Sequence, residues 1–397
     1  MAGSAAVVWD DGYLEYDLGA DHPLNPVRLA LTMALARPLG VLDADHVTVV
    51  APRPATDAEL TLVHDPAYLA AVRRAPGEPF LNGFGFGTAD NPVFPHMHES
   101  SALITGGSVV AAEEVWSGRV LHAVNIAGGL HHAMRSRASG FCVYNDPAVA
   151  IATLLRLGAE RVAYVDVDVH HGDGVQTAFY DDPRVLTISL HQSPLSLFPG
   201  TGFPSELGDG DAVGTSVNVA LPPGTGDAGW LAAFDAVVPS LLRRFRPQIL
   251  VTQSGCDTHR EDPLADLALT VDGQRVSYAA LHALAHELCA GRWLALGGGG
   301  YGLVRCVPRA WTNLLAEAAG RPVPPATAMP ASWLAEVHSR GLGTALPRSM
   351  SDLDDPTSQP EAAIWHPDGQ TPLERAIFAT RRAAFPLYGL DPHDPRD

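Results

Sequence analysis

The stretch RVAYVDVDVHHGDG at residues 161–174 decides how the rest of the chain is interpreted. Its apolar run Val162–Val165 is short and hydrophobic on both alternating sides, which predicts a buried strand. Asp166, Asp168 and His170 follow at alternate positions, so an extended backbone presents all three on one side. Two carboxylates and an imidazole suit a divalent metal that keeps a position open for water. The competing interpretation, a strand that ends in an ordinary polar loop, leaves these charges in need of separate partners.

The composition is that of a globular protein without a disulfide framework. The chain has 397 residues, of which 46% are hydrophobic, enough for one large domain or two ordinary ones. Its four cysteines show no C-x-x-C spacing, which argues against a thiolate zinc site and fits a reducing compartment. The first residues lack the pattern of a signal peptide and no transmembrane segment is indicated. We therefore expect a cytoplasmic protein without a membrane partner.

The formal net charge of -18 argues against nonspecific binding to nucleic acid, whose phosphates require basic patches. The same charge favours cationic substrates, although many acidic proteins simply have solvated surfaces. We expect no direct nucleic-acid partner.

Short apolar runs alternate with helical patterns along most of the chain. The strands are expected at residues 5–9, 121–126, 162–165, 185–190, 216–221, 248–252 and 293–296. The main helices are expected at 26–36, 66–74 with Asp65 as a cap, 99–116, 174–179, 227–244, 278–289 and 303–319, with a further helix capped by Asn145 or Asp146. This alternation predicts an α/β fold, a single domain with a central, mostly parallel sheet flanked by helices on both faces.

Two segments depart from the alternation. Residues 75–98 form a long loop rich in Gly, Pro and Phe, and its aromatic residues, Phe80 among them, favour an ordered rim beside a site. From Arg321 onward the sequence is rich in proline. We therefore expect a catalytic domain at residues 1–320 and an extension at 321–397 that packs on the core or trails from it, with a short helix at 372–384.

Polar clusters follow four of the expected strands at their carboxyl ends. In parallel α/β sheets, sites form beyond this edge. The clusters are His131 and His132 after 121–126, Asp168 and His170 after 162–165, Asp257 after 248–252, and Tyr301 after 293–296. Unrelated polar residues would be scattered over both edges, so the shared edge predicts one catalytic centre.

Residue types suggest a division of roles in this centre. Asp168, His170 and Asp257 provide three metal ligands. The adjacent His131 and His132 suggest paired acid and base roles. Asp166 and Asp173 remain to orient one imidazole each. Tyr301, after four glycines, can donate to a developing oxyanion, although four glycines also suit a tight turn.

Several motifs resemble one family. In order between Asp10 and Ala319, these are GGLHHA, GFCVYND, DVDVHHGDGV, LFPGTG, SGCDTHREDPL and GGGGYGLVR. They resemble the zinc-dependent histone deacetylase family, in its branch of bacterial acetoin-utilisation proteins. The resemblance implies the arginase-deacetylase fold and hydrolysis of N-acetyl-lysine, in a protein or peptide, to lysine and acetate. It also implies Zn²⁺, with Fe²⁺ as an alternative, on Asp168, His170 and Asp257.

The resemblance assigns roles to further residues. It implies the dyads His131–Asp166 and His132–Asp173, with His132 as the general base, and Tyr301 as the group that polarises the acetyl carbonyl. The other implied sites are an acyl-lysine channel with Gly140, Phe141 and Phe198, a rim residue Asp90, a structural K⁺ site with Asp166, Asp168, His170, Ser189 and Leu190, and an acetate channel with Arg28.

Three functions remain open at this point. The first is a protein lysine deacetylase, and the second is a deacetylase of acetylated polyamines or other small acetylated amines. The third, a non-catalytic binding protein, is disfavoured because the expected ligands and the tyrosine are all present. Arginase-like manganese hydrolases would carry ligands for a second metal, and only one complete set is found. The sequence leaves the oligomeric state open.

Overall fold

A parallel sheet of eight strands runs through the centre of the computed structural model, which describes residues 4–78, 83–343 and 345–397. The strand order is β2-β1-β3-β8-β7-β4-β5-β6, and all neighbouring pairs are parallel. The strands are β1 (Ala5–Val8), β2 (Val47–Val50), β3 (His122–Asn125), β4 (Val162–Asp166), β5 (Val185–Gln192), β6 (Ser216–Leu221), β7 (Ile249–Gln253) and β8 (Trp293–Leu296). The expected parallel sheet is confirmed.

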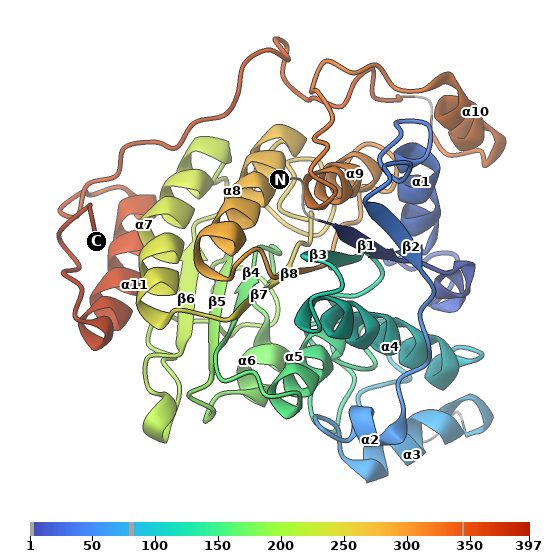
Figure 1. Cartoon of the computed structure of the whole chain (residues 1–397), viewed down its shortest axis with the longest axis horizontal. Coiled ribbons are helices and arrows are strands. Elements are labelled where there is room, and N and C mark those ends of the chain that lie inside the picture. Colours follow the sequence, from blue (N-terminus) through green and yellow to red (C-terminus); the bar gives the residue numbers. More distant parts are fainter. Residues whose placement is uncertain (1–3, 79–82, 344) are drawn as a thin grey trace.

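Helices cover both faces of the sheet (Figure 1). One layer consists of α1 (Val27–Ala36), α7 (Asp227–Phe245), α8 (Val271–Leu288) and α9 (Val307–Ala318). The opposite layer consists of α4 (Met97–Trp116), α5 (Asp146–Arg156) and α6 (Asp173–Ala178), with α2 (Asp57–Leu60) and α3 (Pro66–Arg74) outside them. Short 3₁₀ helices lie at Asp11–Glu15, Ala75–Gly77, Gly210–Ala212 and Phe385–Tyr388.

The two layers explain why β4 is apolar at every position before its terminal aspartate. Ala163 and Val165 belong to the core on one face of the sheet, and Val162 and Tyr164 belong to the core on the other. A strand buried on both faces has no solvent side that would call for polar residues. The first polar side chains can therefore appear only where the strand ends, which is where Asp166 lies.

Most of the expected elements are present, and a few differ. Helix α8 begins at Val271 rather than Tyr278, because Thr270 accepts a hydrogen bond from the Gly273 amide and caps the helix seven residues earlier. Asp65 occupies the N-cap position of α3 but makes no capping hydrogen bond, since its carboxylate instead accepts from Arg135. Strand β2 and helices α2 and α10 (Ala331–Ser339) were not expected.

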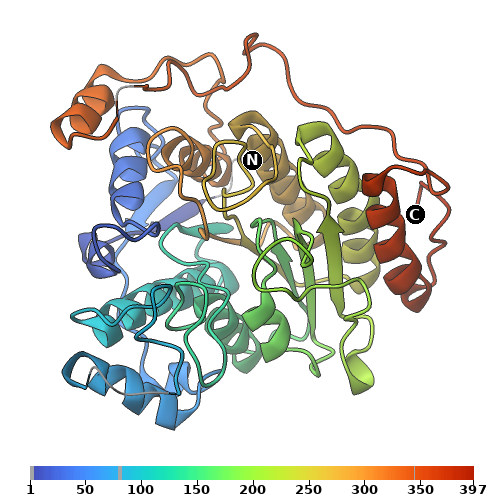
Figure 2. The ribbon, with the colours of Figure 1, turned by 180° about the vertical axis from the view of Figure 1, so that it is seen from behind.

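The C-terminal residues pass over the layer that contains α7, α8 and α9 (Figures 1 and 2). They begin with α10 beside α1 and end with α11 (Pro372–Ala384), which packs on β6 and α7 at the far side of the sheet. Arg381 is buried and donates to the Ala236 carbonyl of α7 at 2.6 Å. The helix expected at residues 372–384 is confirmed, and it lies on the core.

Asp352 anchors the middle of this C-terminal segment. It accepts hydrogen bonds from Arg309 at 2.7 Å and from His259 at 2.7 Å, and all three side chains are almost fully buried. Burial opposes the charged carboxylate, but the hydrogen bond from His259 and the charge of Arg309 outweigh it and hold the pKa of Asp352 well below its ordinary value.

Three phenylalanines of the loop at residues 75–98 pack against the core, whereas residues 76–78 and 87–90 are exposed. Phe84 and Phe86 stack with their ring centroids 5.9 Å apart, and Phe94 is buried. Phe80 falls among residues 79–82, outside the described residues. Within the described residues, no helix combines the length and apolarity needed to cross a bilayer.

Candidate active site

Three buried side chains come together beyond the carboxyl ends of β4 and β7. The ligand atoms of Asp168, His170 and Asp257 all lie within 4.8 Å of one another. His170 Nδ1 is 3.1 Å from Asp168 Oδ1 and 3.2 Å from Asp257 Oδ2. The structure therefore brings together the three ligands predicted from the sequence.

Neighbouring backbone and side-chain donors fix the two carboxylates. Asp168 Oδ2 accepts from the Gly299 amide at 2.7 Å and from Gln253 Nε2 at 2.7 Å, and Asp257 Oδ1 accepts from the Val169 amide at 2.9 Å. A Cβ on Gly299 would collide with the Asp257 carboxylate, so this residue must be glycine for the loop to approach so closely. Each carboxylate keeps an oxygen that faces His170.

The electrostatics of this ligand set fit a cation. Burial and the adjacent Asp168 raise the pKa of Asp257 to about 7. The cause is two carboxylates in one buried space with a single imidazole between them. A divalent ion would offset this charge, and a site with two oxygens and one nitrogen suits Zn²⁺ or Fe²⁺.

The two adjacent histidines each pair with a different aspartate. His131 Nδ1 donates to Asp166 Oδ2 at 2.8 Å, and His132 Nδ1 donates to Asp173 Oδ1 at 2.6 Å. The two Nε2 atoms are 3.0 Å apart, so one proton at most fits between them. Both pairs predicted from the sequence are present. Tyr164, which was not predicted, also donates to Asp166 Oδ2, at 2.6 Å.

The surroundings shift the pKa values of the two imidazoles in opposite directions. Burial disfavours a charged His131, but the charges of Asp166 and Asp168 outweigh it and raise its pKa to about 9. Burial, together with the charge on His131, lowers the pKa of His132 to about 4 despite the nearby Asp173. The two rings therefore differ in proton affinity, and His132, the ring with the lowered pKa, is the one that lines the pocket.

Tyr301 is held by its backbone, and its hydroxyl makes no hydrogen bond within the part of the chain that the structure describes. Its amide donates to Asp262 Oδ2 at 2.8 Å, and its ring meets Phe141 edge to face with centroids 5.7 Å apart. Behind the glycine loop, Arg28 donates to the carbonyls of Gly298 at 2.8 Å and Gly300 at 3.1 Å. Arg28 therefore fixes the loop that carries Tyr301.

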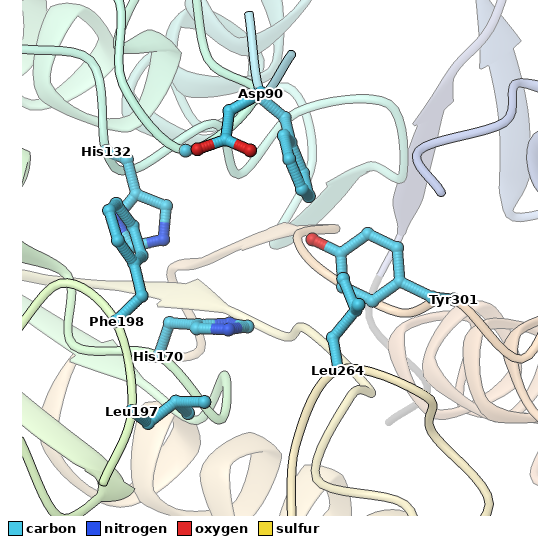
Figure 3. A pocket seen from close by; sticks show the side chains of 9 residues that line it. Asp90, His132, His170, Leu197, Phe198, Leu264 and Tyr301 are labelled. Atoms are coloured by element: carbon cyan, nitrogen blue, oxygen red, sulfur yellow. The ribbon is translucent and has the colours of Figure 1, made fainter. Parts of the chain in front are cut away.

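A pocket of about 200 Å³ opens above this cluster (Figure 3). Figure 3 shows the Tyr301 hydroxyl pointing into the cavity from one side, with His132 and His170 opposite. The residues that line it are Asp90, His132, Gly140, Phe141, His170, Leu197, Phe198, Leu264 and Tyr301. The predicted channel residues Gly140, Phe141, Phe198 and Asp90 all belong to this lining.

The segments implied for potassium lie side by side. Asp166 pairs with Ser189 in the register of β4 and β5, and the Gln192 amide donates to the Val169 carbonyl at 2.9 Å. Asp166, Asp168, His170, Ser189 and Leu190 are all buried. The K⁺ site and the acetate channel at Arg28 stay predictions.

Besides Tyr164, four site residues were not predicted from the sequence. They are Gln253 and Asp262, which hold Asp168 and the Tyr301 backbone, and Leu197 and Leu264, which line the pocket. Gln253 ends β7, the strand before Asp257, so its place at the shared sheet edge was the available signal. Nothing in the pattern distinguishes the two leucines from core residues.

Known proteins match almost the whole chain. The histone deacetylase domain family matches residues 22–318. The acetoin utilization protein AcuC of Bacillus subtilis (strain 168) is 40% identical over 381 residues, which cover 94% of this chain and 97% of that protein. The protein of the same name from Staphylococcus aureus (strain MSSA476) is 37% identical over 338 residues, covering 84% and 86%.

Solved structures agree with these relatives. The crystal structure of an HDAC homolog from Aquifex aeolicus matches with a TM-score of 0.82 and 29% identity, over 96% of this chain and 100% of that one. The crystal structure of an HDAC homolog complexed with SAHA matches with a TM-score of 0.78 and 31% identity, over the same shares. The sheet is therefore that of the arginase-deacetylase fold, and these matches support a deacetylase hydrolase. The chain belongs to the histone deacetylase family, in its acetoin-utilisation branch.

Proposed function

We propose that this protein hydrolyses the amide of N-acetyl-lysine in a protein or peptide and releases lysine and acetate. One observation carries the proposal: the pocket is walled by Phe141 and Phe198 and ends at His132, His170 and Tyr301. Aromatic walls suit the four-carbon stem of lysine, and the polar groups lie where an acetamide at its tip would arrive.

The proposed cofactor is Zn²⁺, with Fe²⁺ as the second candidate, on Asp168, His170 and Asp257. When bound, such an ion polarises a carbonyl and lowers the pKa of water. Three protein ligands leave positions for both. A structural K⁺ near Asp166 and Ser189 belongs to the same proposal.

The protein's own groups would carry the proton transfers. His132 Nε2, whose ring is oriented by Asp173, takes a proton from the attacking water and later gives it to the departing lysine amine. His131, whose ring is held by Asp166, lies beside His132 with the two Nε2 atoms 3.0 Å apart. Tyr301 donates its hydroxyl proton in a hydrogen bond to the acetyl oxygen as negative charge develops there. One water is consumed for each acetate and amine released.

Two further features support the proposal. Asp90 lies at the rim of the pocket, where it can accept from backbone amides of a peptide substrate. All four cysteines are free and buried, which supports the proposed cytoplasmic location, a reducing compartment. The Arg28 guanidinium, buried behind the site, is the proposed contact for departing acetate.

Hydrolysis rates on two substrate classes test the proposal. Metal-loaded protein is assayed on acetyl-lysine peptides and on acetylated polyamines, and we expect the higher kcat/KM on the peptides. Asp90→Asn should lower kcat/KM for the peptides and leave the polyamines unchanged, since only peptides offer backbone amides. Faster polyamine hydrolysis would favour the small-amine alternative. No hydrolysis of either class at full metal content would favour a binding protein.

A further inference from the structure

A second cluster of histidines lies far from the catalytic centre. His122 is the first residue of β3, and His282 and His286 lie one turn apart in α8. His122 pairs in register with Trp293, the first residue of β8. The cluster is therefore at the amino ends of these strands, whereas the catalytic groups lie at the carboxyl ends. Figure 1 shows β3, β8 and α8 next to one another.

Each of the three imidazoles directs its Nε2 atom toward the centre of the cluster. His286 Nε2 lies 3.1 Å from His122 Nε2 and 3.1 Å from His282 Nε2. Ligands bound to zinc at 2.0–2.1 Å in a tetrahedron are about 3.3 Å apart. Histidines four residues apart on a helix also share one face, which is a common arrangement for two metal ligands. The two 3.1 Å separations are thus close to those of a bound metal's ligands, and all three ligand atoms lie within 4.8 Å of one another.

The outer nitrogens of two rings face oxygen acceptors, and for His122 the hydrogen bond fixes where the proton lies. His122 Nδ1 is 2.7 Å from the Ala318 carbonyl, which can only accept, so this nitrogen carries the proton. His282 Nδ1 faces the Glu317 carboxylate at 3.7 Å. In the neutral His122 ring, Nε2 then carries a lone pair directed at the cluster. Acceptors beyond the far nitrogen are the usual support of metal-binding histidines.

Hydrogen bonding alone does not satisfy this arrangement. His286 Nε2 must donate its one proton to pair with the His122 lone pair, and its contact with His282 Nε2 then lacks a matching donor and acceptor in either tautomer of His282. A cation accepts all three lone pairs at once. His122 is buried and His286 is exposed, so one side of the cluster is open to solvent for metal entry and a water ligand.

We propose that His122, His282 and His286 form a second binding site for a divalent transition metal, Zn²⁺ in the first place. Imidazole ligands suit Zn²⁺, Cu²⁺ and Ni²⁺. The site joins the sheet to α8, and its metal would hold the two together. It shares no residue with the catalytic centre, so it stands or fails independently of the proposed deacetylase reaction.

Metal content after equilibration with Zn²⁺ and dialysis against a weak chelator tests the site. His286→Ala removes one ligand from an exposed position, so the fold should survive, and the exposed His338→Ala serves as the matched control. We expect the parent and His338→Ala to retain one equivalent more than His286→Ala, with deacetylase activity unchanged in all three. Equal zinc contents in the parent and His286→Ala would overturn the proposal, whatever the total.

A second readout follows from Trp293, which stacks on His282 with ring centroids 5.4 Å apart. Cu²⁺ in the site would quench this tryptophan. Titration with Cu²⁺ should therefore quench part of the fluorescence of the parent and of His338→Ala at one stoichiometric step. That step should be absent in His286→Ala, and its persistence there would place the copper elsewhere.

Discussion

The hydroxyl of Tyr301 can be removed with little other change. Within the described residues it has no hydrogen-bond partner, while the ring contacts Phe141 and the backbone amide donates to Asp262. Tyr301→Phe keeps both contacts and leaves no group unpaired, so the free energy of unfolding should change by no more than about 0.5 kcal/mol. The donor to the developing oxyanion is lost. Such a loss typically lowers kcat by about 100 to 1000-fold, or roughly 3 to 4 kcal/mol.

The assay compares kcat and KM of the parent and Tyr301→Phe on an acetyl-lysine peptide at matched metal content. KM should change much less than kcat, because the hydroxyl acts on charge that appears only during the reaction. Thermal unfolding of both proteins serves as the control for the fold. If Tyr301→Phe turns over within a few-fold of the parent, the tyrosine is a packing residue of the glycine loop and the proposed oxyanion role is wrong.

Three further predictions concern the ligands, the base and the C-terminal segment. Asp257→Ala should abolish metal binding at the catalytic site, because it removes one of the three ligands. Stoichiometric metal at that site in the variant would exclude Asp257 as a ligand. His132→Ala should lower kcat on the order of 100 to 10000-fold, and His131→Ala should lower it less. Equal residual rates of the two variants at intact metal content would show that the assignment of the general base to His132 is wrong. Asp352→Asn should lower the free energy of unfolding at pH 7 by about 3 kcal/mol, because it breaks a buried ion pair. Since the folded-state pKa of Asp352 is lowered, its contribution is complete above the ordinary value of about 4 and is lost as the pH falls below it. Urea unfolding from pH 7 to pH 3 should show the parent and Asp352→Asn converging, and a constant difference would contradict this.

Local sequence signals predicted the sheet because most of its strands are buried on both faces. Burial explains the continuous apolar run Val162–Val165. Strand β6 is also almost wholly buried, and its bounds agree with the predicted ones. Strand β2 lies at the edge of the sheet with its middle residues Thr48 and Val49 exposed; its β-branched sequence VTVV is typical of a strand, but it was not predicted. Helix α10 follows Pro330 in proline-rich sequence, where composition argues for a loop.

The site was predictable as far as its residues follow strands. The ligands and both dyads lie directly beyond β3, β4 and β7, where the fold class alone brings them together. Asp262 and Leu264 come from a long connection between β7 and α8, and only the folded path of that connection places them at Tyr301 and the pocket. The family resemblance, rather than any spacing, supplied Phe141, Phe198 and Asp90.

The position of β8 determines when the protein can fold during its synthesis. Strands β1 to β3 form one half of the sheet and β4 to β7 the other, and β8 alone lies between them. Until residue 296 has left the ribosome, both halves present an unpaired inner edge, and such edges invite pairing with other chains. The catalytic centre draws residues from both halves, so no nascent chain shorter than this can assemble it. We therefore expect the growing chain to depend on protection of those edges, and shortened products to aggregate rather than show partial activity.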